Sequence, residues 1–83
     1  MAMPKRDTRV YRHKSGGRIQ KIGITQQPLE DRGAQNNADG VKGPIKQIGS
    51  ARTEESARTE EKRLLEQFKT RTGKLPPGNK QIG

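Results

Sequence analysis

Cysteine is absent from this 83-residue chain, and aromatic residues nearly so: there is no Trp, one Tyr and one Phe. Without cysteine the chain can form neither disulfides nor the cysteine-ligated zinc sites that support many small domains. Only 25% of the residues are hydrophobic, so a single domain of this length has little core with which to hold its fold. We therefore expect low stability unless a partner, a nucleic acid or a metal ion adds to it by mass action.

Long hydrophobic runs are also missing. No segment reaches the length of a signal-peptide core or of a membrane-spanning helix. An amphipathic helix lying on a membrane needs a broad apolar face, and the chain has too few apolar residues for one. We therefore expect no membrane partner and action in a soluble compartment, with secretion as part of a larger polypeptide left open.

Positive charge is what the chain has in excess. Lys and Arg total 18 against 9 acidic residues, which gives a formal net charge of +9. Such a charge attracts polyanions, and neutralisation of phosphates by Lys and Arg dominates the affinity of proteins for nucleic acids. Nucleic acid is therefore the first partner predicted. Charge alone does not separate a nuclease from a passive RNA or DNA binder, or from a chain that is basic only for solubility.

The hydrophobic pattern predicts an α+β fold, a small three-stranded antiparallel sheet with two to three flanking helices. Residues 1–7 read as a flexible basic tail and residues 8–83 as a single domain. Thr53 is suited to cap the last helix and Gly73 to end it. In chain order, we expect strands at residues 8–14 and 18–25, a helix at 26–35, a strand at 44–49 and a helix at 53–71.

The first two strands read as a hairpin whose loop length decides which side chains share a face. A three-residue loop at residues 15–17 pairs Val10 with Ile22 and Tyr11 with Lys21. The aliphatic side chains then form a core face, and Tyr11 and Lys21 converge on the other. A two-residue loop would instead place Tyr11 beside Ile22. Because it keeps the aliphatic residues together, we expect the three-residue loop.

One acidic residue of the long helix lies where its apolar stripe should continue. At about 100° per residue, Glu61 falls inside the arc of the stripe. A buried carboxylate is costly unless it is paired, placed at an edge or bound to a metal ion. The alternative is an ordinary surface pair with Arg58. The stripe consists of Ala57, Leu64, Leu65 and Phe68.

The tripeptides Arg-Val-Tyr, ending at Tyr11, and Lys-Ile-Gly, starting at Lys21, resemble the two tripeptides that name the GIY-YIG nucleases. Tyr11, Ile22 and Gly23 agree with that name, whereas Arg9 and Lys21 stand in place of its first Gly and second Tyr. The run from Lys21 onward is similar to a divergent branch of the family, which reads Lys-Ile-Gly-x-Thr.

Three further residues fall where this family places functional ones. Arg32 lies on the helix after the second strand, Glu61 precedes a pair of leucines, and Asn79 follows Pro-Pro-Gly. The resemblance spans nearly the whole chain, from Arg9 to Asn79. It implies the α+β fold predicted above and metal-dependent cleavage of nucleic-acid phosphodiester bonds, with DNA preferred to RNA.

The resemblance also implies a role for each residue. Glu61 would hold Mg²⁺ or Mn²⁺, which take few protein oxygens and complete their shells with water and phosphate. Arg32 would contact the phosphate oxygens, and Tyr11 or Lys21 would orient or deprotonate the attacking water. His13 is a third candidate base, because it lies two residues from Tyr11 and shares its face. The expected nucleic-acid contacts are Arg9, Arg12, Lys14, Arg18 and Asn79.

Each assignment has a structural alternative. Tyr11 would be a half-buried strand aromatic, His13 an exposed strand residue in a basic patch, and Asn79 part of a turn. Lys21 and Arg32 would be general phosphate-attracting charge. The corresponding function is a non-catalytic nucleic-acid-binding module on the same scaffold.

The closing residues 73–79 are similar to the tail of nuclease domains found at the C-termini of bacterial polymorphic toxins. This resemblance implies a toxic effector that is delivered as the C-terminal part of a secreted polypeptide and acts in the cytoplasm. It also implies an acidic immunity protein as a partner that covers the basic face.

Overall fold

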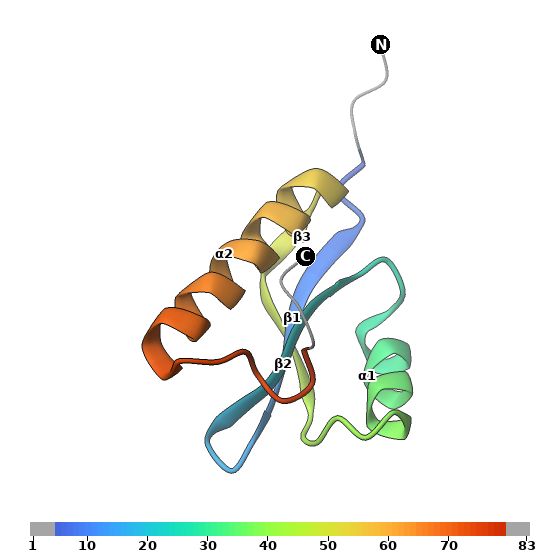
Figure 1. Cartoon of the computed structure of the whole chain (residues 1–83). Coiled ribbons are helices and arrows are strands. Elements are labelled where there is room, and N and C mark those ends of the chain that lie inside the picture. Colours follow the sequence, from blue (N-terminus) through green and yellow to red (C-terminus); the bar gives the residue numbers. More distant parts are fainter. Residues whose placement is uncertain (1–4, 80–83) are drawn as a thin grey trace.

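The computed structural model describes residues 5–79, so residues 1–4 of the expected tail and residues 80–83 lie outside the described residues. Its strands form one antiparallel sheet in the order β2-β1-β3. The predicted α+β class is confirmed as a three-stranded antiparallel sheet with two helices. The elements of the described chain are β1 (Thr8–Ser15), β2 (Arg18–Thr25), α1 (Leu29–Ala38), β3 (Ile45–Arg52) and α2 (Glu54–Thr72) (Figure 1).

Helix α2 begins after Thr53 and ends before Gly73, the two capping residues that the sequence predicts. The Thr53 hydroxyl accepts a hydrogen bond from the backbone nitrogen of Ser56 at 3.2 Å, and Gly73 ends the helix with a φ of 86°. The other boundaries differ from the prediction. Helix α1 begins after Pro28 and continues to Ala38, three residues past its predicted end, and β3 likewise extends to residue 52.

The hairpin turn is shorter than predicted. Gly16 and Gly17, with φ values of 60° and 79°, form a two-residue turn between the paired residues Ser15 and Arg18. Positive φ at both central positions matches the right-handed twist of the flanking strands, and glycine adopts it without strain. The three-residue loop expected from the aliphatic pattern is therefore wrong.

A β-bulge in β2 adds the extra residue that the longer loop was expected to add, so the aliphatic residues Val10, Ile22 and Ile24 still share one face of the sheet. Gln20 has no partner on β1, and this extra residue restores the in-and-out order of β2. The expected pairing of Val10 with Ile22 and Tyr11 with Lys21 is wrong by two residues, which leaves these four side chains on their predicted faces. Ile19, which lies before the bulge, packs against the aliphatic core and not beside Lys21. The observed pairs include Val10 with Ile24, Tyr11 with Gly23, and His13 with Lys21.

The two faces of the sheet are covered by different helices (Figure 1). Helix α2 packs on the aliphatic face, whereas α1 packs on the face that carries Tyr11 and His13. The core is therefore apolar on one side and polar on the other. The buried aliphatic cluster consists of Val10, Ile22, Ala57 and Leu65.

The segment after α2 returns to the sheet and covers the outer edge of β2. The Gly78 backbone nitrogen donates to the Gln20 carbonyl at 2.6 Å. The Asn79 side chain bonds both backbone groups of Ile22, accepting from its nitrogen at 2.9 Å and donating to its carbonyl at 2.8 Å. These bonds satisfy part of an edge that would otherwise be open to pairing with another strand.

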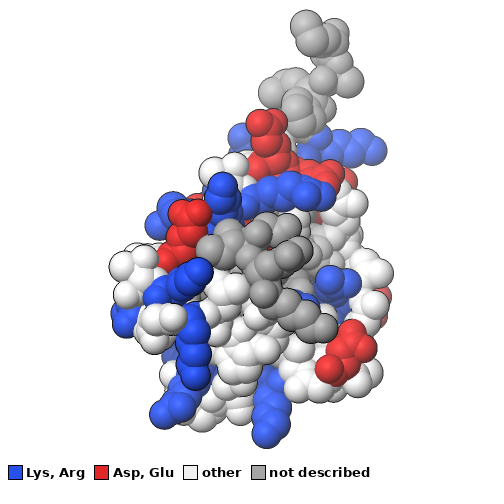
Figure 2. Space-filling model, in the orientation of Figure 1, with Lys and Arg blue, Asp and Glu red and all other residues white. Residues whose placement is uncertain are grey.

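Figure 2 shows how charge is distributed over the face seen in Figure 1. Lys and Arg side chains are spread widely across it. The lower left, over the hairpin and the C-terminal end of α2, shows Lys and Arg but no Asp or Glu.

Candidate active site along the edge of strand β2

Tyr11 and Arg32, which the sequence assigned to one site, are in contact. The Tyr11 hydroxyl accepts hydrogen bonds from Asn36 Nδ2 at 3.1 Å and from Arg32 Nε at 3.5 Å. Its ring lies on Gly23, where an added Cβ would come 2.5 Å from the hydroxyl oxygen. A glycine at this position is therefore what allows the hydroxyl to reach β2.

Asn36 is a site residue that sequence reasoning missed. Its amide nitrogen also donates to His13 Nε2 at 3.1 Å, while His13 Nδ1 donates to the Gly43 carbonyl at 3.0 Å. Because Nε2 must accept, the proton resides on Nδ1. Asn36 was placed in a loop because the helix was expected to end at residue 35. Its spacing of four from Arg32, which puts both on one helix face, was the available signal.

His13 and Tyr11 are both fully buried, with 0% relative exposure, and their rings meet edge to face. Neither half-burial of Tyr11 nor exposure of His13, the structural alternatives for these residues, is observed. Both ring nitrogens of His13 are engaged in holding α1 and the loop before β3 against the sheet. Neither side chain meets solvent in this arrangement.

Glu61 occupies the half-buried position that its place in the apolar stripe predicts. Ala57 and Leu65, one turn away on each side, are buried. Burial raises the pKa of the Glu61 carboxyl, and the positive charges of Arg58 and then Lys21 oppose that rise. The carboxylate of α2 therefore lies within electrostatic range of Lys21 on β2.

Lys21 lies on β2, an outer strand of the sheet. As the cross-strand partner of His13 it belongs to the α1 face, yet β2 is the outer strand, so its side chain stands at the sheet edge. The predicted residues thus do not form a single cluster: a first group, Tyr11 with Arg32, lies under α1, whereas Glu61 lies on α2 and is within electrostatic range of Lys21 only. Within residues 5–79, no hydrogen bond or ion pair joins Glu61 to either member of the first group.

Two hollows lie along the edge of β2. Arg32 lines one of about 270 Å³ that reaches from α1 to Glu54 at the start of α2. Lys21 lines another of about 780 Å³, closed on one side by Gly78 and Asn79. Each hollow is therefore lined by one cation and one carboxylate, Arg32 with Glu54 in the first and Lys21 with Asp39 in the second.

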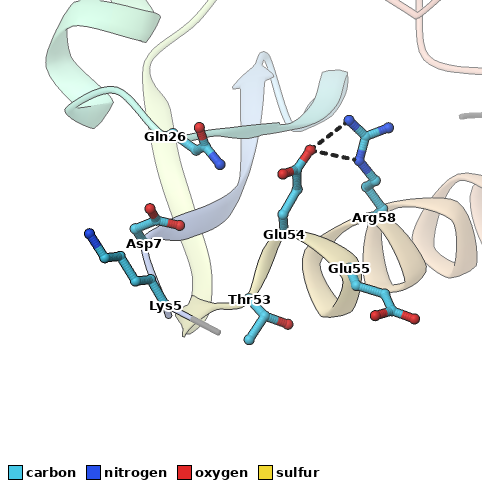
Figure 3. Close-up of a pocket in the computed structure, with 7 residues that line it drawn as sticks. All are labelled: Lys5, Asp7, Gln26, Thr53, Glu54, Glu55 and Arg58. Carbon is cyan, nitrogen blue, oxygen red and sulfur yellow. Dashed lines mark hydrogen bonds and ion pairs between the residues drawn. The ribbon is translucent and has the colours of Figure 1, made fainter. Parts of the chain in front are cut away.

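Two other carboxylates of α2 are engaged in ion pairs. Figure 3 shows the hollow at the start of this helix, where Glu54 accepts from Arg58 at 2.8 Å. Glu60 is paired with Arg63, and the hydrogen bond from Arg63 lowers the pKa of the Glu60 carboxyl. Glu54 and Glu60 are therefore engaged in surface ion pairs, and Glu61 is the α2 carboxyl whose pKa is raised by burial.

The candidate site offers a hard cation one carboxylate, that of Glu61. The described residues contain no group of three or more His, Cys, Asp or Glu side chains that could hold a metal ion. Glu61 would therefore be the one carboxylate ligand, and Mg²⁺ commonly binds through one or two carboxylates with water and phosphate completing its shell. A cation beside Glu61 would also favour the charged form that burial disfavours.

The expected nucleic-acid contacts separate into three places. Arg12, Lys14 and Arg18 line a hollow between the hairpin and the C-terminal end of α2. Arg9 lies half-buried near the other end of β1 and is not among the residues lining that hollow. The amide of Asn79 is engaged with β2, so its role in the fold is to hold the edge strand.

Comparison with models of protein families, with curated proteins and with solved structures gives no match. Across residues 5–79, the helices are too short or too polar for any to cross a membrane.

Proposed function

We propose that the chain is a divalent-metal-dependent endonuclease domain that cleaves nucleic-acid phosphodiester bonds along the edge of β2. The observation that carries the proposal is the half-buried Glu61 carboxylate, which is within electrostatic range of Lys21 on β2, the strand next to the one that holds Arg32 through the Tyr11 hydroxyl. DNA is the expected substrate, because the GIY-YIG nucleases that the sequence resembles act mostly on DNA.

Arg32 is suited to stabilise a phosphoryl group. Its guanidinium is held from two sides, by the Tyr11 hydroxyl at 3.5 Å and by Gln35 Oε1 at 3.1 Å. A fixed guanidinium strengthens its hydrogen bonds as negative charge develops on the non-bridging oxygens. Tyr11, being buried, acts through Arg32 and is a positioning residue.

Lys21 is the group best placed to orient the attacking water. Tyr11 and His13 are fully buried, whereas Lys21 is partly exposed, lines a hollow and lies near Glu61. Its ammonium donates hydrogen bonds that can hold water or a phosphate oxygen at the strand edge. When bound at Glu61, Mg²⁺ or Mn²⁺ supplies Lewis acidity for the phosphoryl oxygens and for water.

A second function is favoured by a different observation. Tyr11 and His13 are engaged in the packing of α1, which is what a non-catalytic nucleic-acid-binding module would need from them. On either reading, an acidic immunity protein is a suitable partner, because its charge would complement the basic surface.

Supercoiled plasmid and transfer RNA, each incubated with the protein in Mg²⁺ or in EDTA, test the proposal. We expect plasmid nicking that requires Mg²⁺. Glu61→Gln should lower the rate by at least about 100-fold, the scale for removing one group that stabilises developing charge. The control is Glu66→Gln, which makes the same change at an exposed carboxylate of the same helix.

Three outcomes decide between the readings. Nicking lost in Glu61→Gln and kept in Glu66→Gln supports the nuclease, provided that DNA binding survives in both variants. Binding without cleavage by the unaltered protein supports the non-catalytic module. Equal cleavage in EDTA, or an active Glu61→Gln variant, removes the proposed metal site.

A further inference from the structure

A basic groove lies away from the candidate active site, between the hairpin tip and the C-terminal end of α2. Its volume is about 740 Å³, and no Asp or Glu is among the residues that line it. Three segments contribute to its walls: the two hairpin strands, the last turns of α2 and the residues that follow the helix. Its five cations are Arg12, Lys14, Arg18, Arg71 and Lys74.

These cations are not accounted for by internal pairing. The ion pairs recorded within residues 5–79 join Arg58 to Glu54 and Arg63 to Glu60, and none of those four residues lines the groove. The dipole of α2 favours a cation at its C-terminal end, which explains Arg71 but not the three cations of the hairpin. Gathering like charges raises the energy of the free protein, and a bound polyanion would relieve that repulsion.

An apolar floor accompanies the cations. Phe68, the only Phe of the chain, is half-buried and lines the groove together with Ile19 and Leu75. Phosphate binding to a duplex requires cations but no aromatic ring. An aromatic side chain within a cationic groove is typical of sites for single strands, where unpaired bases stack on the ring while cations follow the backbone.

The groove is connected to the candidate active site but distinct from it. Arg12 projects to the α2 face of the sheet, whereas Tyr11, its neighbour in the strand, projects to the α1 face. Neither Arg32 nor Glu61 lines the groove. Gln20 and Pro77, however, line both the groove and the hollow of Lys21, so a strand leaving the groove would continue along the edge of β2.

We propose that the basic groove binds a single-stranded segment of nucleic acid, with its phosphates on the hairpin cations and a base against Phe68. As a means of guiding substrate to the edge of β2, this site rests on the nuclease activity proposed above. As a binding site it does not, so binding is measured in EDTA, where the proposed cleavage cannot occur.

The test is fluorescence anisotropy with a labelled 12-nucleotide oligothymidylate and a duplex of equal length, over a series of salt concentrations. The double variant Lys14→Gln, Arg18→Gln should weaken oligonucleotide binding and make the slope of log K against log salt shallower by about 1.4, since each lost single-strand contact contributes about 0.7. The control Lys42→Gln, Lys62→Gln removes equal charge from exposed positions outside the groove and should leave the slope nearly unchanged.

Phe68→Leu keeps an apolar side chain of similar size and removes the ring. It should weaken oligonucleotide binding about tenfold, within the range measured for loss of base stacking, and leave duplex binding unchanged. Tighter binding of the duplex than of the oligonucleotide, or an unchanged affinity of Phe68→Leu, would overturn the proposal. Polyglutamate of equal charge that binds as tightly, and is weakened by the same double variant, would identify a surface for an acidic protein instead.

The two proposals can fail separately. Glu61→Gln should bind the oligonucleotide as the unaltered protein does. If nothing is cleaved but the groove variants lose oligonucleotide binding, the groove is supported and the nuclease is not. If cleavage is observed while the groove variants bind normally, the nuclease is supported and the groove is not.

Discussion

Gly23 lies against the Tyr11 ring, and replacing it with alanine tests whether the position of the hydroxyl matters. The added Cβ would come 2.5 Å from the hydroxyl oxygen and 2.6 Å from the ring carbon that bears it. Non-bonded heavy atoms are at their best separation at about 3.5–4.0 Å, so the ring end must move by about 1 Å. Because Tyr11 is fully buried, this movement pushes it into Asn36 and Arg32.

Two effects of different size are expected from Gly23→Ala. Overpacking costs about 1–3 kcal/mol of folding free energy, and each kcal/mol lowers the melting temperature of a domain this size by about 4–8 °C. The Arg32 hydrogen bond to Tyr11, at 3.5 Å, is already long and should be lost. A misplacement of about 1 Å near reacting groups lowers rates about 100-fold, so cleavage should fall by that order even in fully folded protein.

Gly33→Ala is the matched control. Its Cβ would come 2.7 Å from Ile45 Cγ2, on the same face of the sheet but away from Tyr11. Melting temperatures and plasmid nicking rates are measured for both variants at a temperature where both are folded. The reasoning is refuted if Gly23→Ala cleaves at the unaltered rate, or if Gly33→Ala loses cleavage to the same degree.

Three further predictions concern stability and toxicity. Burial raises the pKa of Glu61 above its ordinary value of 4.5, so the folded state disfavours the charged carboxylate and loses stability as pH rises through the raised pKa. In EDTA at pH 7, Glu61→Gln should therefore melt at a higher temperature than the unaltered protein, with the gain vanishing below pH 4.5; a lower melting temperature would contradict this. Asn79→Ala removes both side-chain bonds to Ile22 and should cost about 1–3 kcal/mol, with faster amide exchange at Ile22; unchanged exchange would count against it. Expression in bacteria should arrest growth and Glu61→Gln should relieve the arrest, whereas harmless expression of the unaltered chain rules out the toxin.

Local signals determined much of the fold. Thr53 and Gly73 mark the ends of α2 because a cap and a left-handed glycine act on their own helix, with no help from distant residues. The half-burial of Glu61 could also be predicted from the sequence, because helical periodicity places it on the same face of α2 as the buried Ala57 and Leu65. The sequence also assigned Tyr11 and Arg32 to one site, and they are in contact.

The tertiary structure decided the features that join distant parts of the chain. The alternation of hydrophobic residues in β2 is compatible with a longer loop or with a short turn and a bulge at Gln20, so only the assembled sheet selects one. Asn36 bonds partners 23 and 25 residues away, and Asn79 bonds Ile22 from 57 residues away. The basic groove likewise combines the hairpin with the end of α2. Periodicity reports which face of its own element a side chain occupies, whereas a bond between elements depends on how those elements pack, and that is settled by the whole chain together.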